Sequence, residues 1–181
     1  GKKIILVFNK IDSITEKEKT KQQELITLYK HIGYQCIPCS ATTGEGVNFI
    51  QVQLKEKKTL LVGHSGLGKS TLINQLAPHI DQKVQAISNF SEKGIHTTTF
   101  AEMFEIDKNT LIIDTPGIKE LGLVDIQTGE IAHYFPELKT LIHQCKFYNC
   151  THTHEPNCAI QQAIKEGKIA LSRYQSYLSI L

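Results

Sequence analysis

The chain has 181 residues, of which 40% are hydrophobic and 21% charged, and its formal net charge is +2. This composition is ordinary for a soluble globular protein with one substantial core and a small appendage, and the low charge gives no sign of a dedicated nucleic-acid-binding domain. No apolar run approaches the roughly 20 residues of a membrane span and no secretory signal is present, so we expect a cytoplasmic protein without membrane contact. The chain opens on Gly1 and enters a predicted strand almost at once, which suggests a fragment.

Short apolar runs alternate with longer polar or amphipathic segments in the first 114 residues. The predicted strands are residues 3–8, 34–39, 58–62, 100–106 and 110–114, and the predicted helices are residues 13–32, 47–54 and the segment from 71 onward. This alternation predicts an α/β fold with five parallel strands and helices on both faces of the sheet. From about Ile131 the pattern changes to short helices around a Cys/His-rich loop. We therefore predict two domains, residues 1–130 and 131–181.

The first two predicted strands each end in a short polar motif. The first is followed by the tetrapeptide NKID, which begins at Asn9. The Asp12 carboxylate can accept hydrogen bonds from N1–H and the exocyclic amine of guanine, a pair of donors that adenine lacks. Lys10 can lie along the base, and Asn9 can tie this loop to a phosphate-binding loop. Ser40 and Ala41, after the second strand, fit a loop whose backbone completes guanine recognition.

A glycine-rich loop follows the third predicted strand. Its pattern G-x4-G-K-S is that of a phosphate-binding loop, in which glycines let backbone N–H groups converge on phosphates. Lys69 can reach the β- and γ-phosphates of GTP or GDP, Ser70 can ligate Mg²⁺, and the following helix adds its positive end. The residues predicted to contact the nucleotide here are Gly63, His64, Ser65, Gly66, Leu67, Gly68, Lys69, Ser70 and Thr71.

The last predicted strand ends in Asp114-Thr-Pro-Gly117. Asp114 is placed to hold Mg²⁺ through water, and the Gly117 N–H can meet the γ-phosphate. Between this motif and the phosphate loop lies the run GIHTTT, where a threonine would complete the magnesium shell. Thr98 or Thr97 is the candidate, and the spacing does not choose between them.

The catalytic machinery is sparse. Many GTPases place a glutamine after the glycine of this motif to orient the attacking water, but Ile118 occupies that position here. The sole arginine, Arg173, lies beyond the Cys/His cluster, so it is an improbable arginine finger. His96, beside the threonine run, is the nearest polar candidate for orienting water. The predicted catalytic set is Lys69, His96 and Thr98, with slow intrinsic turnover.

Three cysteines and a histidine cluster near the C-terminus. Cys145, Cys150, His152 and Cys158 lie within fourteen residues and form a Cys₃His set typical of a structural Zn²⁺ site. His154 or His143 could replace His152 as the fourth ligand. A metal would stabilise a lobe with so little apolar surface. The other two cysteines, at positions 36 and 39, have thioredoxin-like spacing but lie in a predicted strand, which favours core packing.

The chain resembles the circularly permuted GTPases of bacterial small-ribosomal-subunit biogenesis (the RsgA/YjeQ type). The resemblance lies in the order of its motifs, which is NKxD, Ser-Ala, phosphate loop, HTTT, DTPG and Cys₃His. The resemblance extends to FPEL at 135–138, EPNCAI at 155–160 and RYQSYL at 173–178. It implies a GTPase that hydrolyses GTP to GDP, binds the 30S subunit and its 16S rRNA late in assembly, and is stimulated by that subunit. We expect a monomer with one zinc ion.

This chain departs from that family in one respect. Members carry an N-terminal OB-fold RNA-binding domain, and a strand and helix before the NKID strand, which are lacking here. Five candidate parallel strands remain where a complete G domain has six, and the missing one belongs beside the phosphate-loop strand.

Two rival hypotheses remain. One is a nucleotide-gated RNA- or ribosome-binding module with negligible turnover. The other is an ATP-dependent kinase with a zinc lid, against which NKID argues.

Overall fold

A computed structural model describes residues 2–80, 102–115 and 126–181. The chain divides into two compact units, one formed by Gly1–Ile26 with Tyr34–Leu121 and the other by Thr27–Gly33 with Gly122–Leu181. The described part of the second unit from residue 126 onward is called the C-terminal lobe below. The domain boundary at residue 130 stays a prediction.

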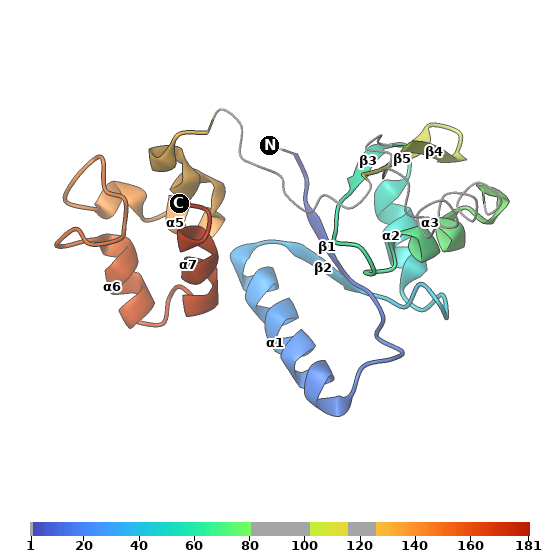
Figure 1. The fold of residues 1–181 in the computed structure, drawn as a ribbon, viewed down its shortest axis with the longest axis horizontal. Coiled ribbons are helices and arrows are strands. Elements are labelled where there is room, and N and C mark those ends of the chain that lie inside the picture. The colour runs from blue at the N-terminus through green and yellow to red at the C-terminus, as the bar shows by residue number, and fades with distance from the viewer. Residues whose placement is uncertain (1, 81–101, 116–125) are drawn as a thin grey trace, which may run out of the picture. The chain divides into compact units, whose positions relative to one another are not determined.

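The described strands of the first unit form two separate sheets (Figure 1). In one sheet, β1 (Ile5–Phe8) pairs in parallel with β2 (Gln35–Pro38). In the other, β3 (Lys58–Leu61) pairs in parallel with β5 (Thr110–Asp114), and β4 (Glu102–Asp107) lies on the far side of β5. Each predicted strand is thus present, and most are shorter than predicted.

The direction of β4 corrects the sequence interpretation. We expected five parallel strands, but β4 runs antiparallel to β5. Only Lys108 and Asn109 separate the two strands, and Asn109 adopts a φ of 72°. A connection this short can only turn the chain back on itself, because a parallel crossover needs a dozen or more residues.

A reciprocal cap accounts for the start of the first helix. Helix α1 (Glu16–Ile32) starts three residues later than predicted, because Thr15 and Glu18 cap its first turn reciprocally. The Thr15 N–H donates to Glu18 Oε2 at 2.7 Å, and the Glu18 N–H donates to Thr15 Oγ1 at 3.4 Å. Helix α2 spans Val47–Leu54 as predicted, and α3 (Lys69–Leu76) is followed by the short η1 (Pro78–Ile80).

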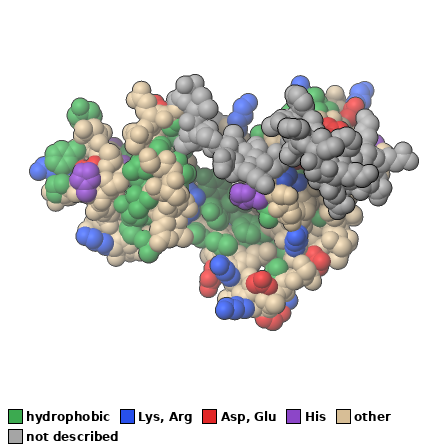
Figure 2. Space-filling model, in the orientation of Figure 1, with side chains coloured by type: hydrophobic (Ala, Val, Ile, Leu, Met, Phe, Trp, Pro, Cys, Tyr) green, Lys and Arg blue, Asp and Glu red, His purple; other side chains and the backbone are tan. Residues whose placement is uncertain are grey.

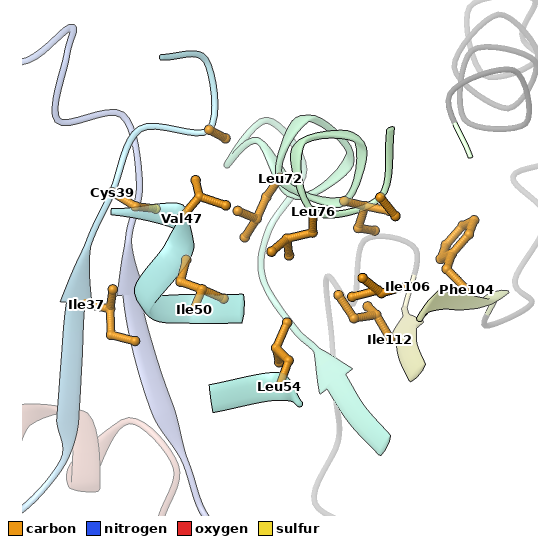
Figure 3. Close-up of a cluster of buried hydrophobic side chains, with 13 residues drawn as sticks. Ile37, Cys39, Val47, Ile50, Leu54, Leu72, Leu76, Phe104, Ile106 and Ile112 are labelled. Atoms are coloured by element: carbon orange, nitrogen blue, oxygen red, sulfur yellow. The ribbon is translucent and has the colours of Figure 1, made fainter. Parts of the chain in front are cut away.

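Helices α2 and α3 contribute to a core shared with strands of both sheets (Figure 3). Side chains from β2, α2, α3, β4 and β5 meet there, namely Ile37, Cys39, Val47, Ile50, Leu54, Leu72, Ile73, Leu76, Phe104, Ile106 and Ile112. Both early cysteines are buried and neither is in a disulfide, in agreement with the prediction that they pack in the core. Burial raises the pKa of the Cys39 thiol to about 11, so it is neutral at physiological pH.

The C-terminal lobe consists of short helices around a second core. These are η2 (Thr128–Tyr134), α5 (Pro136–Lys139), η3 (Ile142–Gln144), α6 (Ala159–Lys165) and α7 (Leu171–Leu178). Phe135 and Tyr177 pack edge to face at 5.7 Å in this core, with Leu138 and Ile160 fully buried beside them. None of the helices in the described residues is long and apolar enough to cross a membrane.

Candidate nucleotide site and metal centre

The phosphate-loop segment links β3 to α3 through a turn that depends on glycine. Gly66 and Gly68 adopt φ values of 82° and 85°, a region that favours glycine. A Cβ on Gly68 would also lie only 2.5 Å from the Asn9 side-chain nitrogen. The Lys69 ammonium donates to the carbonyls of Gly63 at 2.6 Å and His64 at 3.1 Å, which holds the charge over the loop.

The NKID loop contacts the phosphate loop through two side chains. The Asn9 amide donates from Nδ2 to the Leu67 carbonyl at 3.0 Å, and Lys10 Nζ donates to the Gly66 carbonyl at 2.7 Å. On its other side, Asn9 Oδ1 accepts a hydrogen bond from the Ala41 N–H at 2.9 Å. Asn9 therefore joins three loops that lie far apart in the sequence: NKID, Ser-Ala and phosphate loop.

The Ser-Ala loop is built around buried polar groups. Ser40 is fully buried, and its hydroxyl accepts a hydrogen bond from the Thr43 N–H at 3.0 Å. Ala41 is also buried, whereas Asp12 is exposed to solvent at the neighbouring NKID loop. The carboxylate of Asp12 is thus accessible to a ligand, next to a backbone segment that is held in place.

Sequence reasoning missed one participant at this junction. The buried Cys39 thiol donates toward Asn9 Oδ1 at 3.6 Å, and the Cys39 carbonyl accepts from the Ile11 N–H at 3.3 Å. The sequence pattern favours core packing alone for Cys39. The available signal was its position directly before Ser40, where the second strand reaches the site.

Asp114 provides a carboxylate suited to a cation. Its Oδ1 atom is buried and has no hydrogen-bond partner among the described residues. Burial raises the pKa of Asp114, although the charge of Lys69 and the Thr115 N–H act in the opposite direction. Ser70 lies exposed in the first turn of α3. The carboxylate oxygen of Asp114 and the exposed hydroxyl of Ser70, which follows the phosphate loop, are both oxygen ligands of the kind that Mg²⁺ prefers.

Several predicted site residues lie outside the described residues. These are His96, Thr97, Thr98, Gly117 and Ile118. Their predicted roles at the γ-phosphate and at the attacking water stay predictions.

The structure brings the four predicted metal ligands together in the C-terminal lobe. The ligand atoms of Cys145, Cys150, His152 and Cys158 all lie within 4.8 Å of one another. His152 Nδ1 is 3.6 Å from the Cys145 sulfur and 3.5 Å from the Cys158 sulfur. His143 and His154 are exposed and do not belong to this group, so the geometry favours His152 as the fourth ligand.

The pKa values of the histidine and a cysteine in this cluster are shifted in ways that bear on metal binding. Burial lowers the pKa of His152, which favours the neutral imidazole that binds metals. Burial raises the pKa of the Cys150 thiol to about 12, so a cation must replace its proton before the sulfur can act as a thiolate ligand. Three thiols and one imidazole converging in a partly buried site form a donor set for a tetrahedral metal ion.

Outer hydrogen bonds hold the histidine in an unusual backbone conformation. His152 has a φ of 61°, and its carbonyl accepts a hydrogen bond from the Tyr174 hydroxyl at 2.7 Å. The Tyr177 hydroxyl donates to the preceding carbonyl of Thr151, also at 2.7 Å. The Glu155 carboxylate accepts from the Thr151 N–H and hydroxyl, both at 2.6 Å. Two aromatic side chains and one carboxylate thus fix the ligand loop from outside.

The sole arginine has a structural place in the same lobe. Arg173 Nε lies 2.5 Å from Glu137 Oε1, and both side chains are nearly buried, at 12% and 11% exposure. Its guanidinium also lies 4.7 Å from the centre of the Phe135 ring. A guanidinium engaged in this way connects α7 to α5.

Residues 1–124 match the sequence profile of the family described as RsgA GTPase. The chain belongs to this family. It is 52% identical over 176 residues to the small ribosomal subunit biogenesis GTPase RsgA of Bacteroides fragilis, covering 97% of this chain and 57% of that relative. It is 49% identical over 181 residues to the protein of the same name from Porphyromonas gingivalis, covering 98% and 58%. The chain thus spans somewhat more than half the length of these relatives.

Two solved structures resemble the fold. The crystal structure of YjeQ from Thermotoga maritima has a TM-score of 0.80 and 34% identity, covering 98% of this chain and 58% of that one. YloQ, described as a circularly permuted GTPase, has a TM-score of 0.72 and 26% identity, covering 97% and 54%. These similarities confirm the predicted family and the predicted circularly permuted α/β fold.

Proposed function

We propose that this chain binds GTP, hydrolyses it to GDP, and acts in the biogenesis of the small ribosomal subunit. The names of its relatives support both parts of the proposal, since each is called a small ribosomal subunit biogenesis GTPase. The proposal further assigns it a cytoplasmic location, a monomeric state, and the 30S subunit with its 16S rRNA as partner.

The observation that carries the nucleotide assignment is the position of Asn9. Its side chain bridges the Ser-Ala loop and the phosphate loop with hydrogen bonds of 2.9 and 3.0 Å. A single ligand can therefore present a base to one loop and phosphates to the other. Guanine is favoured over adenine because the exposed Asp12 carboxylate can accept from two donors that only guanine offers.

We assign the binding of the phosphates and of Mg²⁺ to Lys69, Ser70 and Asp114. Lys69 would bind the β- and γ-phosphates, and Ser70 and Asp114 would hold Mg²⁺, with Thr98 completing the shell. When bound, the ion neutralises charge that develops on the phosphates during transfer. The orphaned Oδ1 atom of Asp114 supports this assignment.

Zinc is the metal we propose for the C-terminal lobe, with one ion held by the Cys₃His set. Three sulfurs and one nitrogen favour Zn²⁺ over the oxygen-seeking cations. All four positions of a tetrahedron would be filled by protein, so the site would be structural rather than catalytic.

The testing experiment is multiple-turnover GTP hydrolysis with and without purified 30S subunits. We expect slow turnover by the chain alone and clear stimulation by the subunit, and the Asp12→Asn variant should lose both.

The rival function is a nucleotide-gated binding module. It is favoured by the ion pair of Arg173 with Glu137, because the sole arginine is then not available as an arginine finger. Single-turnover hydrolysis separates the two, because a gated module would bind GTP and 30S subunits without forming GDP.

A further inference from the structure

The loop between the first two metal ligands presents an aromatic side chain to solvent. Residues 146–149, with the sequence KFYN, connect Cys145 to Cys150, and the Cys150 N–H donates to the Phe147 carbonyl at 3.3 Å. Because the ligand atoms of both cysteines belong to one cluster less than 4.8 Å across, the two ends of this loop are held close together. The loop is therefore a short, anchored projection.

Tyr148 at its tip is fully exposed, with a relative exposure of 103%. Two other tyrosines of the lobe are engaged in its interior. Tyr177 is 1% exposed and packs against Phe135, and the Tyr174 hydroxyl holds the His152 carbonyl. Tyr148 makes no ring contact or hydrogen bond with the described residues, so its whole face is open to a partner.

The charge beside this ring is positive. Lys146 lies with its ammonium 5.4 Å from the centre of the Phe147 ring and has no ion pair among the described residues. By contrast, Lys168 pairs with Glu166 and Arg173 pairs with Glu137. Figure 2 shows Lys/Arg and hydrophobic side chains close together on the surface of the lobe. The KFYN loop thus combines an exposed ring, a half-exposed ring and a cation, with no acid.

We propose that the KFYN loop is an RNA-contacting element in which Tyr148 stacks on an unpaired base while Lys146 meets a neighbouring phosphate. This inference rests on the proposed function for the identity of the partner as RNA. Aromatic side chains on compact metal-held loops suit single-stranded RNA, whose unstacked bases expose their faces, whereas a duplex hides them. Since the KFYN loop itself carries a single lysine, stacking should contribute more than charge, and affinity should depend weakly on salt.

The chain contains no tryptophan, which gives a direct probe. A Tyr148→Trp substitution in the full chain introduces a single reporter whose emission is quenched when a base stacks on it. We expect quenching on titration with a short unstructured RNA of about ten nucleotides. The same RNA annealed to its complement should quench much less. The matched control is Tyr134→Trp, because Tyr134 is also exposed (62%) in the same lobe but lies outside the loop.

Affinity measurements complete the test. Tyr148→Ala should weaken binding of the unpaired RNA about fivefold to a hundredfold, and Tyr148→Phe should retain it, since a phenyl ring still stacks. Unchanged affinity of Tyr148→Ala, unquenched emission from the Tyr148→Trp variant, or no RNA binding by the unaltered chain would each overturn the inference. Labelled GDP binding is measured in parallel: loss of nucleotide binding or hydrolysis with intact RNA quenching contradicts the proposed function and leaves the KFYN assignment standing.

Discussion

The side chain of Asn9 donates a hydrogen bond to the carbonyl of Leu67, a residue 58 positions later in the chain. The same side chain accepts from the Ala41 N–H, so one amide holds the phosphate loop and the Ser-Ala loop together. Circular permutation places these loops in reverse order along the chain, and the contact shows that they nevertheless lie side by side in the structure. Affinity for nucleotide should depend on this one side chain.

Replacing Asn9 with alanine should weaken GDP binding about tenfold or more. The variant loses the hydrogen bonds with Leu67 and Ala41, each worth about 1 kcal/mol, together with the longer contact from the Cys39 thiol, and leaves the Ala41 N–H without its partner. Binding of fluorescent GDP measures the effect. Ser13→Ala is the control, because the Ser13 hydroxyl bonds only within the NKID loop, to the Lys10 carbonyl. Equal affinities for the two variants would contradict the bridging role.

Asp12→Asn should change which base is bound. The amide cannot accept from both guanine donors, and its own donors face them, so GTP binding should fall by a few kcal/mol while xanthine nucleotides bind better. Competition between GTP and XTP reports the switch. Asp107→Asn, an exposed aspartate on β4 away from every motif, should behave as the unaltered chain. Unchanged GTP affinity in Asp12→Asn rules out the guanine assignment.

Cys150→Ser should release the metal and unfold the C-terminal lobe, yet leave GDP binding largely intact. The four ligands lie in the lobe, whereas the nucleotide loops lie in the first unit. Metal analysis of freshly purified, chelator-free protein should find one zinc ion per chain, and much less in the variant. Cys36→Ala, a buried cysteine outside the cluster, should keep the full metal content. Zinc-free unaltered protein would rule out the proposed metal.

Arg173→Met should destabilise the lobe by about 3 kcal/mol, because the Glu137 carboxylate would stay buried without its partner. Urea unfolding monitored by circular dichroism gives the measurement. Lys168→Ala removes an exposed, solvent-screened ion pair with Glu166 and should have a much smaller effect than Arg173→Met. Combining Arg173→Met with Glu137→Leu should restore much of the loss. Single-turnover hydrolysis per folded molecule should not change, and a large catalytic defect there would show that Arg173 takes part in the reaction.

Much of this architecture could be predicted from the sequence, because apolar runs fix the strands and the motifs stand at their ends. The prediction of a parallel β4 was wrong, because alternation with helices does not fix the direction of a strand, whereas the two-residue connection at Lys108 and Asn109 does. Spacing could not choose the fourth metal ligand either. Three histidines lie near the cysteines in sequence. Only the structure shows that the Nδ1 atom of His152 lies against the cysteine sulfurs, at a residue whose backbone has a φ of 61°.

His96→Ala tests the last element of the mechanism. Without a glutamine at position 118, intrinsic turnover should be slow, on the order of 10⁻³ s⁻¹ or below. If His96 orients the attacking water, the variant assayed with saturating 30S subunits should lose most of the stimulated rate at unchanged GTP affinity. His79→Ala is a suitable control, because His79 bonds to the Glu105 carbonyl at the far side of β4. Full stimulation of His96→Ala would show that the subunit supplies the missing group.

The separation of β1–β2 from β3–β5–β4 has a thermodynamic consequence. In the described residues no backbone hydrogen bonds join the two sheets as a ladder, so side-chain packing and the contacts of Asn9 and Lys10 hold them in register. A nucleotide that touches both would bind only the aligned arrangement and would act as a reversible cross-link. By mass action, ligand at about a hundred times its dissociation constant adds about 2.7 kcal/mol to the free energy of unfolding. The folded fraction of the first unit would then rise and fall with the concentration of guanine nucleotide around it.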